Sequence, residues 1–98
     1  TSSYFDSPHG LPNRNNISTA CDMALLSFEC MKISVFCEVV KSAVFETGSY
    51  EWLNTNKLLS GVDSDCETGP KPFRGTLGCK TGVTNTAGPC FSGYFVRD

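Results

Sequence analysis

The sequence predicts a small, disulfide-rich α+β domain. We expect a long or kinked N-terminal helix and a short second helix to pack on a small antiparallel sheet. Three observations support this fold class. The chain has 98 residues, which fits one domain over 1–98. Its first half has apolar residues at helical spacing, and its second half combines two strand-like runs with many Gly, Thr and Pro residues.

Residues 1–17 are mostly polar residues and turn formers, which predicts a flexible or draped N-terminal arm. Pro8 and Pro12 remove backbone donors that a central strand would need. The single histidine, His9, lies between Pro8 and Gly10, in a turn. Asn16-Ile17-Ser18 matches the N-glycosylation sequon, so Asn16 is a candidate glycosylation site.

A helix is predicted to begin at Thr19. The Thr19 hydroxyl can accept a hydrogen bond from the backbone N–H of Asp22, and the Asp22 carboxylate can accept one from the N–H of Thr19, as in a capping box. Apolar residues then recur every three or four positions, which predicts a helix from about residue 19 to about 45. These residues are Leu26, Cys30, Ile33, Cys37, Val40 and Val44. The alternative is a helix to about residue 31 followed by a strand over Ile33–Val40, because Ile, Val and Phe favour strands. A break near Met31–Lys32 is compatible with both.

The second helix is predicted to follow Gly48, with Ser49 as its cap, Glu51 in its first turn and Gly61 at its end. Pro70 and Pro72 exclude a helix in the next segment. Short strands are predicted over Phe73–Lys80 and Cys90–Arg97. They would be joined by an irregular loop at 81–89.

The six cysteines predict a disulfide framework, because an even number of widely spaced cysteines in a short chain is typical of secreted proteins. They are Cys21, Cys30, Cys37, Cys66, Cys79 and Cys90. None is spaced as zinc ligands are, so no metal site is predicted from them. On a continuous helix Cys30 and Cys37 lie about 10.5 Å apart, beyond the roughly 7 Å that a disulfide spans. The first three would then pair with the last three; a strand near residue 32 would instead allow Cys21–Cys37.

Composition and motifs exclude several functions. The net charge of −2 without a basic cluster argues against nucleic acid, and no apolar run is long enough to span a membrane. The chain starts at Thr1, which fits a secreted extracellular protein whose signal peptide has been removed. Acidic residues at 63, 65 and 67 alternate as in a calcium loop, but Arg74 stands where the bidentate Glu belongs, so neither a metal nor a cofactor is predicted.

We therefore predict a non-enzymatic secreted protein that binds a protein or cell-surface receptor on another cell, of effector, toxin or signalling type. No Gly-x-Ser-x-Gly or His-Glu-x-x-His motif is present, and the thiols would be committed to disulfides. One alternative is a lipid or sterol carrier, with the apolar helix enclosing a cavity. A third is a small hydrolase or ribonuclease that uses His9. The candidate partner-binding residues are Arg74, Thr84, Asn85, Thr86, Tyr94 and Arg97.

Overall fold

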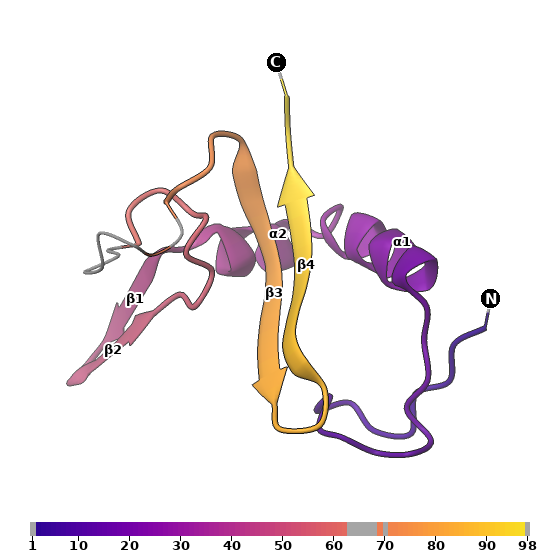
Figure 1. Ribbon diagram of the computed structural model, residues 1–98. Coiled ribbons are helices and arrows are strands. Elements are labelled where there is room, and N and C mark those ends of the chain that lie inside the picture. Colours follow the sequence, from indigo (N-terminus) through magenta and orange to yellow (C-terminus); the bar gives the residue numbers. More distant parts are fainter. Residues whose placement is uncertain (1, 63–68, 70, 98) are drawn as a thin grey trace.

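Two short helices are followed along the chain by two separate β-hairpins. The computed structural model describes residues 2–62, 69 and 71–97. Its elements are α1 (Ala20–Cys30), α2 (Ser34–Lys41), β1 (Val44–Thr47), β2 (Tyr50–Leu53), β3 (Thr76–Thr84) and β4 (Gly88–Phe95). Figure 1 shows the β3–β4 ribbon in the middle, with the β1–β2 hairpin extending to one side and α1 lying on the other. The predicted α+β class is confirmed.

The first helix begins where the capping signal predicts. Oγ1 of Thr19 accepts a hydrogen bond from the backbone N–H of Asp22 at 3.1 Å. The Asp22 carboxylate does not bond back to the cap as a capping box requires. Its Oδ2 instead accepts bonds from the Ser2 N–H at 2.9 Å and from the Ser3 hydroxyl at 2.6 Å. Asp22 therefore ties the start of the N-terminal arm (residues 1–17) to α1.

A turn at residues 31–33 divides the predicted long helix in two. The N–H groups of Lys32 and Ile33 bond to carbonyls three residues back, at 3.2 and 3.0 Å, which tightens the end of α1. The chain then forms α2, so the alternative of a strand over Ile33–Val40 is wrong. The predicted helix to about residue 45 is also wrong at its end. Ser42 has an extended backbone, and β1 begins at Val44.

The predicted second helix after Ser49 is wrong, because residues 44–53 form the β1–β2 hairpin. Gly48 has a φ of 54°, and Gly48-Ser49 makes the two-residue turn between the strands. Phe45 pairs with Trp52 across the hairpin, and Tyr50 stacks beside Trp52, with ring centroids 6.0 and 5.6 Å apart. Aromatic residues at alternating positions favour paired strands, and this outweighs the capping signal of Ser49.

The predicted antiparallel pair in the C-terminal half is present as the β3–β4 ribbon, but its connection is shorter than predicted. The strands run over 76–84 and 88–95, so the turn occupies only residues 85–87. Thr81 lies opposite Phe91, and Thr84 lies opposite Gly88. Most of the predicted 81–89 loop is therefore regular strand, because its Thr and Val residues suit a paired ribbon.

Both helices pack against the ribbon, α2 on β3 and α1 on β4. Gly78 of β3 is buried against α2, so closely that a Cβ there would lie 2.8 Å from Cγ2 of Val40. Ser27 is the buried residue of α1, and its hydroxyl lies 2.7 Å from the hydroxyl of Ser92 in β4. The two helices thus position the middle of the ribbon from one side.

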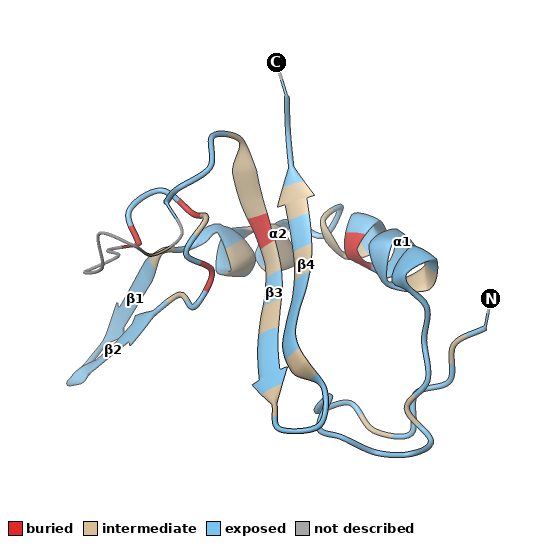
Figure 2. Ribbon diagram, in the orientation of Figure 1, coloured by how far each residue is buried: buried red, intermediate tan, exposed pale blue. Residues whose placement is uncertain are grey.

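The described part of the chain buries little apolar surface. The accessible area is 7911 Å², whereas a folded monomer of 10.6 kDa exposes about 5,500 Å². Leu59 and Val62 are its buried apolar residues. Most of α1 and the β1–β2 hairpin are exposed, whereas most of β3 is buried or half-buried (Figure 2). No helix within residues 2–62 or 71–97 is long and apolar enough to cross a membrane.

The predicted disulfide framework is not seen among the described residues. Five thiols are free there: Cys21, Cys30, Cys37, Cys79 and Cys90. Cys66, like the acidic positions 63, 65 and 67, lies outside the described residues. The geometric argument for pairing also changes, because Cys30 and Cys37 belong to two different helices.

Candidate functional site

The middle of β3 carries a Lys-Thr-Gly triplet, Lys80-Thr81-Gly82. Lys80 and Gly82 are exposed, and Thr81 is half-buried. The Lys80 ammonium donates a hydrogen bond to the backbone carbonyl of Thr81, and no ion pair forms between Lys80 and any described residue. A Cβ at Gly82 would meet no atom within 4 Å. The triplet thus presents a cation, a hydroxyl and an unobstructed backbone next to one another.

Within the described residues, β3 has a strand partner along one edge only. β3 pairs with β4 on one side, and no other strand of the described chain pairs with it. The unpaired edge of a strand offers backbone N–H and C=O groups to an extended peptide. The Lys-Thr-Gly triplet lies on this strand, so a peptide bound along it would pass the Lys80 and Thr81 side chains.

A short loop after β2 touches the triplet. Oγ1 of Thr55 lies 2.5 Å from Oγ1 of Thr81, across 26 residues of sequence. Its neighbour Asn54 is fixed to the end of α2, because the side-chain Nδ2 donates to the carbonyls of Val40 at 3.2 Å and Ser42 at 2.9 Å. The loop therefore connects the end of α2 to the hydroxyl of Thr81.

Asn56 anchors the other side of this loop. Its side chain is 3% exposed, and its Oδ1 accepts a hydrogen bond from the N–H of Leu58 at 3.2 Å. Its own N–H donates to Oδ1 of Asn54 at 2.9 Å. Nδ2 of Asn56 is buried without a hydrogen-bond partner in the described part of the chain. With the buried Leu59 and Val62, Asn56 places the small buried core beside the loop that touches Thr81.

Cys79 precedes the triplet but is not suited to be a nucleophile. Burial raises the pKa of the Cys79 thiol, and the neighbouring Cys30 raises it further, although a hydrogen bond with Ser27 opposes the shift. A raised pKa keeps the thiol protonated at neutral pH, and the thiolate is the reactive form. Cys79 is therefore a half-buried, protonated thiol beside Ser27 and Cys30.

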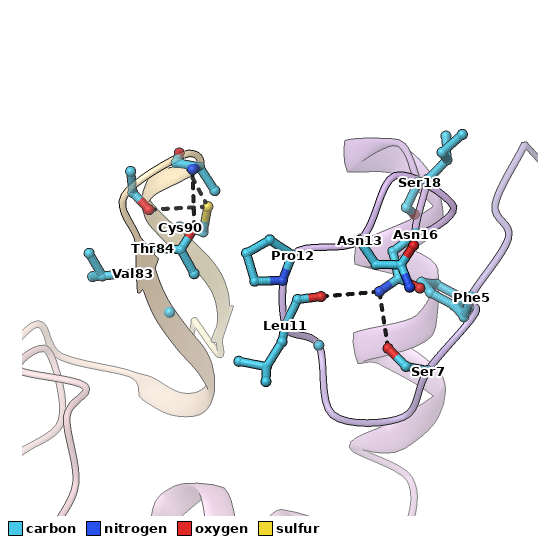
Figure 3. A pocket seen from close by; sticks show the side chains of 15 residues that line it. Phe5, Ser7, Leu11, Pro12, Asn13, Asn16, Ser18, Val83, Thr84 and Cys90 are labelled. Atoms are coloured by element: carbon cyan, nitrogen blue, oxygen red, sulfur yellow. Dashed lines mark hydrogen bonds between the residues drawn. The ribbon is translucent and has the colours of Figure 1, made fainter.

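A cavity of about 360 Å³ lies at the end of β3, directly after the triplet. Figure 3 shows Val83 and Thr84 of the ribbon on one side and Leu11 and Pro12 of the N-terminal arm on the other. Gly82 also lines it. The lining is mainly apolar, and it extends the surface of the triplet toward the arm.

Asn16 holds the arm in this position. Its Nδ2 donates to Oγ of Ser7 at 3.2 Å and to the carbonyl of Leu11 at 3.3 Å (Figure 3). Its Oδ1 accepts the N–H of Asp6 at 2.6 Å. Asn16 lines the cavity as well. Glycosylation of Asn16 stays a prediction.

The ribbon does not bring the predicted partner-binding residues together. Thr84 lines the cavity, and Asn85 and Thr86 form the exposed turn beside it. The other three lie toward the opposite end of the ribbon: Arg74 before β3, Tyr94 opposite Gly78, and Arg97 after β4. Their role in binding a partner stays a prediction.

His9, the residue proposed for the alternative hydrolase, lies in the exposed arm. Its Nδ1 accepts the N–H of Leu11 at 3.0 Å, as part of the turn.

Comparison with known proteins identifies a family for the whole chain. The sequence model of the D-alanyl-D-alanine carboxypeptidase family matches residues 1–98, so the chain belongs to this peptidase family. No curated protein and no solved structure matches the chain. Lys-Thr-Gly is one of the three motifs, with Ser-x-x-Lys and Ser-Asp-Asn, that characterise penicillin-binding proteins. Lys80-Thr81-Gly82 supplies that motif here, and the other two do not occur among the 98 residues.

Membership of a peptidase family corrects the predicted function. The expectation of a non-enzymatic binder of effector, toxin or signalling type is wrong, and so is the lipid-carrier alternative. The sequence analysis predicts a loop over 81–89 with Thr84, Asn85 and Thr86 as partner-binding candidates, although residues 81 and 82 belong to a Lys-Thr-Gly triplet. The signal that could have found the site is this triplet within a run of strand-forming residues, next to a turn. Peptidases of the cell wall act outside the cytoplasm, which is compatible with the predicted extracellular location.

Proposed function

We propose that these residues supply the Lys-Thr-Gly strand of a serine-type D-alanyl-D-alanine carboxypeptidase site. In this proposal the free edge of β3 binds the peptide as an added strand, and Lys80 and Thr81 bind its terminal carboxylate. A carboxylate accepts hydrogen bonds only, and an ammonium and a hydroxyl are matching donors. The observation that carries the proposal is the Lys80-Thr81-Gly82 triplet, with Lys80 and Gly82 exposed, on a strand edge without a strand partner among the described residues of a member of this family.

The same proposal requires the nucleophilic serine to come from protein outside these 98 residues, because no Ser-x-x-Lys occurs in them. The large exposed apolar area supports this requirement. The total accessible area exceeds the about 5,500 Å² of a typical monomer by more than 2,000 Å², and many large apolar side chains are exposed, so the surface has room for a protein interface. We also place the protein outside the cytoplasm, where peptides ending in D-alanyl-D-alanine occur in the cell wall.

Binding of a short peptide tests the proposal. We would titrate the ¹⁵N-labelled 98-residue chain with an N-acetylated tripeptide ending in D-Ala-D-Ala and follow backbone amide shifts. Saturable shifts are expected along β3, centred on Lys80 and Thr81. Peptides ending in L-Ala-L-Ala or in a C-terminal amide should bind at least several-fold more weakly. Equal shifts with all three peptides, or none in β3, would rule the proposal out.

Replacing Lys80 tests whether its positive charge contributes to peptide binding, and the same replacement of Lys71 is the matched control. Lys80→Ala is expected to weaken peptide binding by about five- to tenfold, about 1–1.4 kcal/mol, because a charge-assisted hydrogen bond is lost at an exposed site. Lys71→Ala, outside the triplet, removes the same charge and should leave the affinity unchanged. The isolated chain should release no D-alanine from the peptide; release would contradict the external origin of the nucleophile.

A further inference from the structure

The hydroxyl pair Thr55–Thr81 lies at the centre of the proposed site. The two Oγ1 atoms are 2.5 Å apart, so one hydroxyl donates its hydrogen to the other. Thr81 belongs to the Lys-Thr-Gly triplet, whereas Thr55 comes from the loop after β2. Within the described residues Thr55 is the hydrogen-bond partner of the Thr81 hydroxyl.

The direction of this bond decides what Thr81 can do. A hydroxyl has one hydrogen, and a carboxylate can only accept. If Thr81 donates to Thr55, its hydrogen is used and it cannot donate to a peptide carboxylate. If Thr55 donates to Thr81, the Thr81 hydrogen is free to point outward. Donation from Thr81 to the carboxylate therefore requires Thr55 to be the donor within the pair.

We propose that Thr55 is a positioning residue of the site: it donates to Oγ1 of Thr81 and directs the Thr81 hydroxyl hydrogen at the peptide carboxylate. This inference rests on the proposed function, because it assigns the ligand of Thr81. Thr55 acts through Thr81 and does not itself touch the peptide.

The surrounding loop is built to hold Thr55 in place. On one side, the Asn54 side chain bonds to two carbonyls at the end of α2, and the Asn54 N–H donates to the carbonyl of Ala43 at 2.8 Å. On the other side, Asn56 is 97% buried and bonds to Asn54 and Leu58. Thr55 itself is exposed, so its hydroxyl can be removed without opening the buried core.

A double-mutant cycle on peptide affinity tests this role. Thr55→Val keeps the shape of the side chain and removes the donor, whereas Thr55→Ser keeps the donor. Thr55→Val should weaken binding of the D-Ala-D-Ala tripeptide by about fivefold, because the Thr81 hydroxyl is then free to rotate. Thr55→Ser should stay within about twofold of the wild type. Amide shifts of Asn54 and Asn56 report whether the loop is intact.

The Thr81→Val background separates positioning from a general structural effect. If Thr55 acts only through the Thr81 hydroxyl, Thr55→Val should change affinity less than about twofold once Thr81 is Val. The same fivefold loss in both backgrounds, or no loss in the wild-type background, would overturn the inference while leaving peptide binding by β3 intact. If the valine variant does not fold, Thr55→Ala removes the same donor and has the same expected outcomes. Absence of peptide binding by the wild-type chain would overturn both proposals.

Discussion

Replacing Gly78 by alanine is expected to disturb the packing of α2 on the strand that carries the Lys-Thr-Gly triplet. A Cβ at this position would lie 2.8 Å from Cγ2 and 3.2 Å from Cβ of Val40. Ordinary contacts between such atoms begin at 3.4 Å, so α2 and β3 would have to separate by about 0.6 Å at the closest pair. Gly78 is buried and Val40 is half-buried, so the Val40 side chain has little room to move away from the added methyl group.

The size of the effect follows from this overlap. Adding one methyl group to a packed contact costs about 1–3 kcal/mol in free energy of unfolding. We expect Gly78→Ala to lower the urea midpoint of the 98-residue chain accordingly. Gly82→Ala is the matched control on the same strand, since a Cβ there meets nothing within 4 Å. It should leave stability unchanged or raise it slightly, because alanine restricts the unfolded chain.

A second substitution identifies the clash itself. Val40→Ala removes the atom nearest to the new methyl group, so Gly78→Ala should cost at least about 1 kcal/mol less in a Val40→Ala background than in the wild type. If Gly78→Ala is as harmless as Gly82→Ala, or if Val40→Ala brings no relief, then the close approach of α2 to β3 is not what holds the strand. That outcome would refute a clash between Val40 and a side chain at position 78.

Two further predictions concern the arm and the thiols. Hydrogen bonds from Ser3 and Ser2 lower the pKa of the Asp22 carboxyl in the folded chain. The bonds between Asp22 and the arm are therefore fully present above the pKa that this carboxyl has in the unfolded chain. They are lost as the pH falls through its lower pKa in the folded chain. Amide shifts of Ser2 and Ser3 should follow that acid titration and be absent in Asp22→Asn; a transition that persists in this variant would contradict the assignment. Cys79 should react with iodoacetamide more slowly than the exposed Cys21 at pH 8, as mass spectrometry of modified peptides can measure, because its pKa is raised by burial. Equal alkylation rates for Cys79 and Cys21 would show that burial does not lower the reactivity of the Cys79 thiol.

Local signals predicted the parts of the fold that local interactions determine. Thr19 begins α1 because its hydroxyl satisfies a nearby backbone donor, which the sequence spacing alone reveals. The strand pair of the C-terminal half was also predicted, since its residues favour strands and flank a turn. The β1–β2 hairpin was missed because Ser49 and Glu51 carry a helix-start signal, and this loses to cross-strand pairing between Phe45 and Trp52.

The candidate site was missed for two reasons. The predicted boundary at residue 80 divided the Lys80-Thr81-Gly82 triplet between a strand and a loop, whereas all three residues lie on β3. The contact of Thr55 with Thr81 joins residues 26 positions apart, and no periodicity or spacing rule predicts it. Such a contact depends on where the loop after β2 lies once α2 and β3 have packed together. Only the three-dimensional arrangement supplies that information.

The position of the triplet therefore depends on α2 in two ways. α2 packs directly on Gly78, two residues before Lys80, and its C-terminal carbonyls hold Asn54, whose neighbour Thr55 reaches Thr81. A displacement of α2 would move both the strand and the loop that contacts it. Loss of the α2 packing by Gly78→Ala should therefore weaken peptide binding as well as stability, whereas Thr55→Val should weaken binding alone. The two variants separate the placement of the strand from the orientation of its hydroxyl.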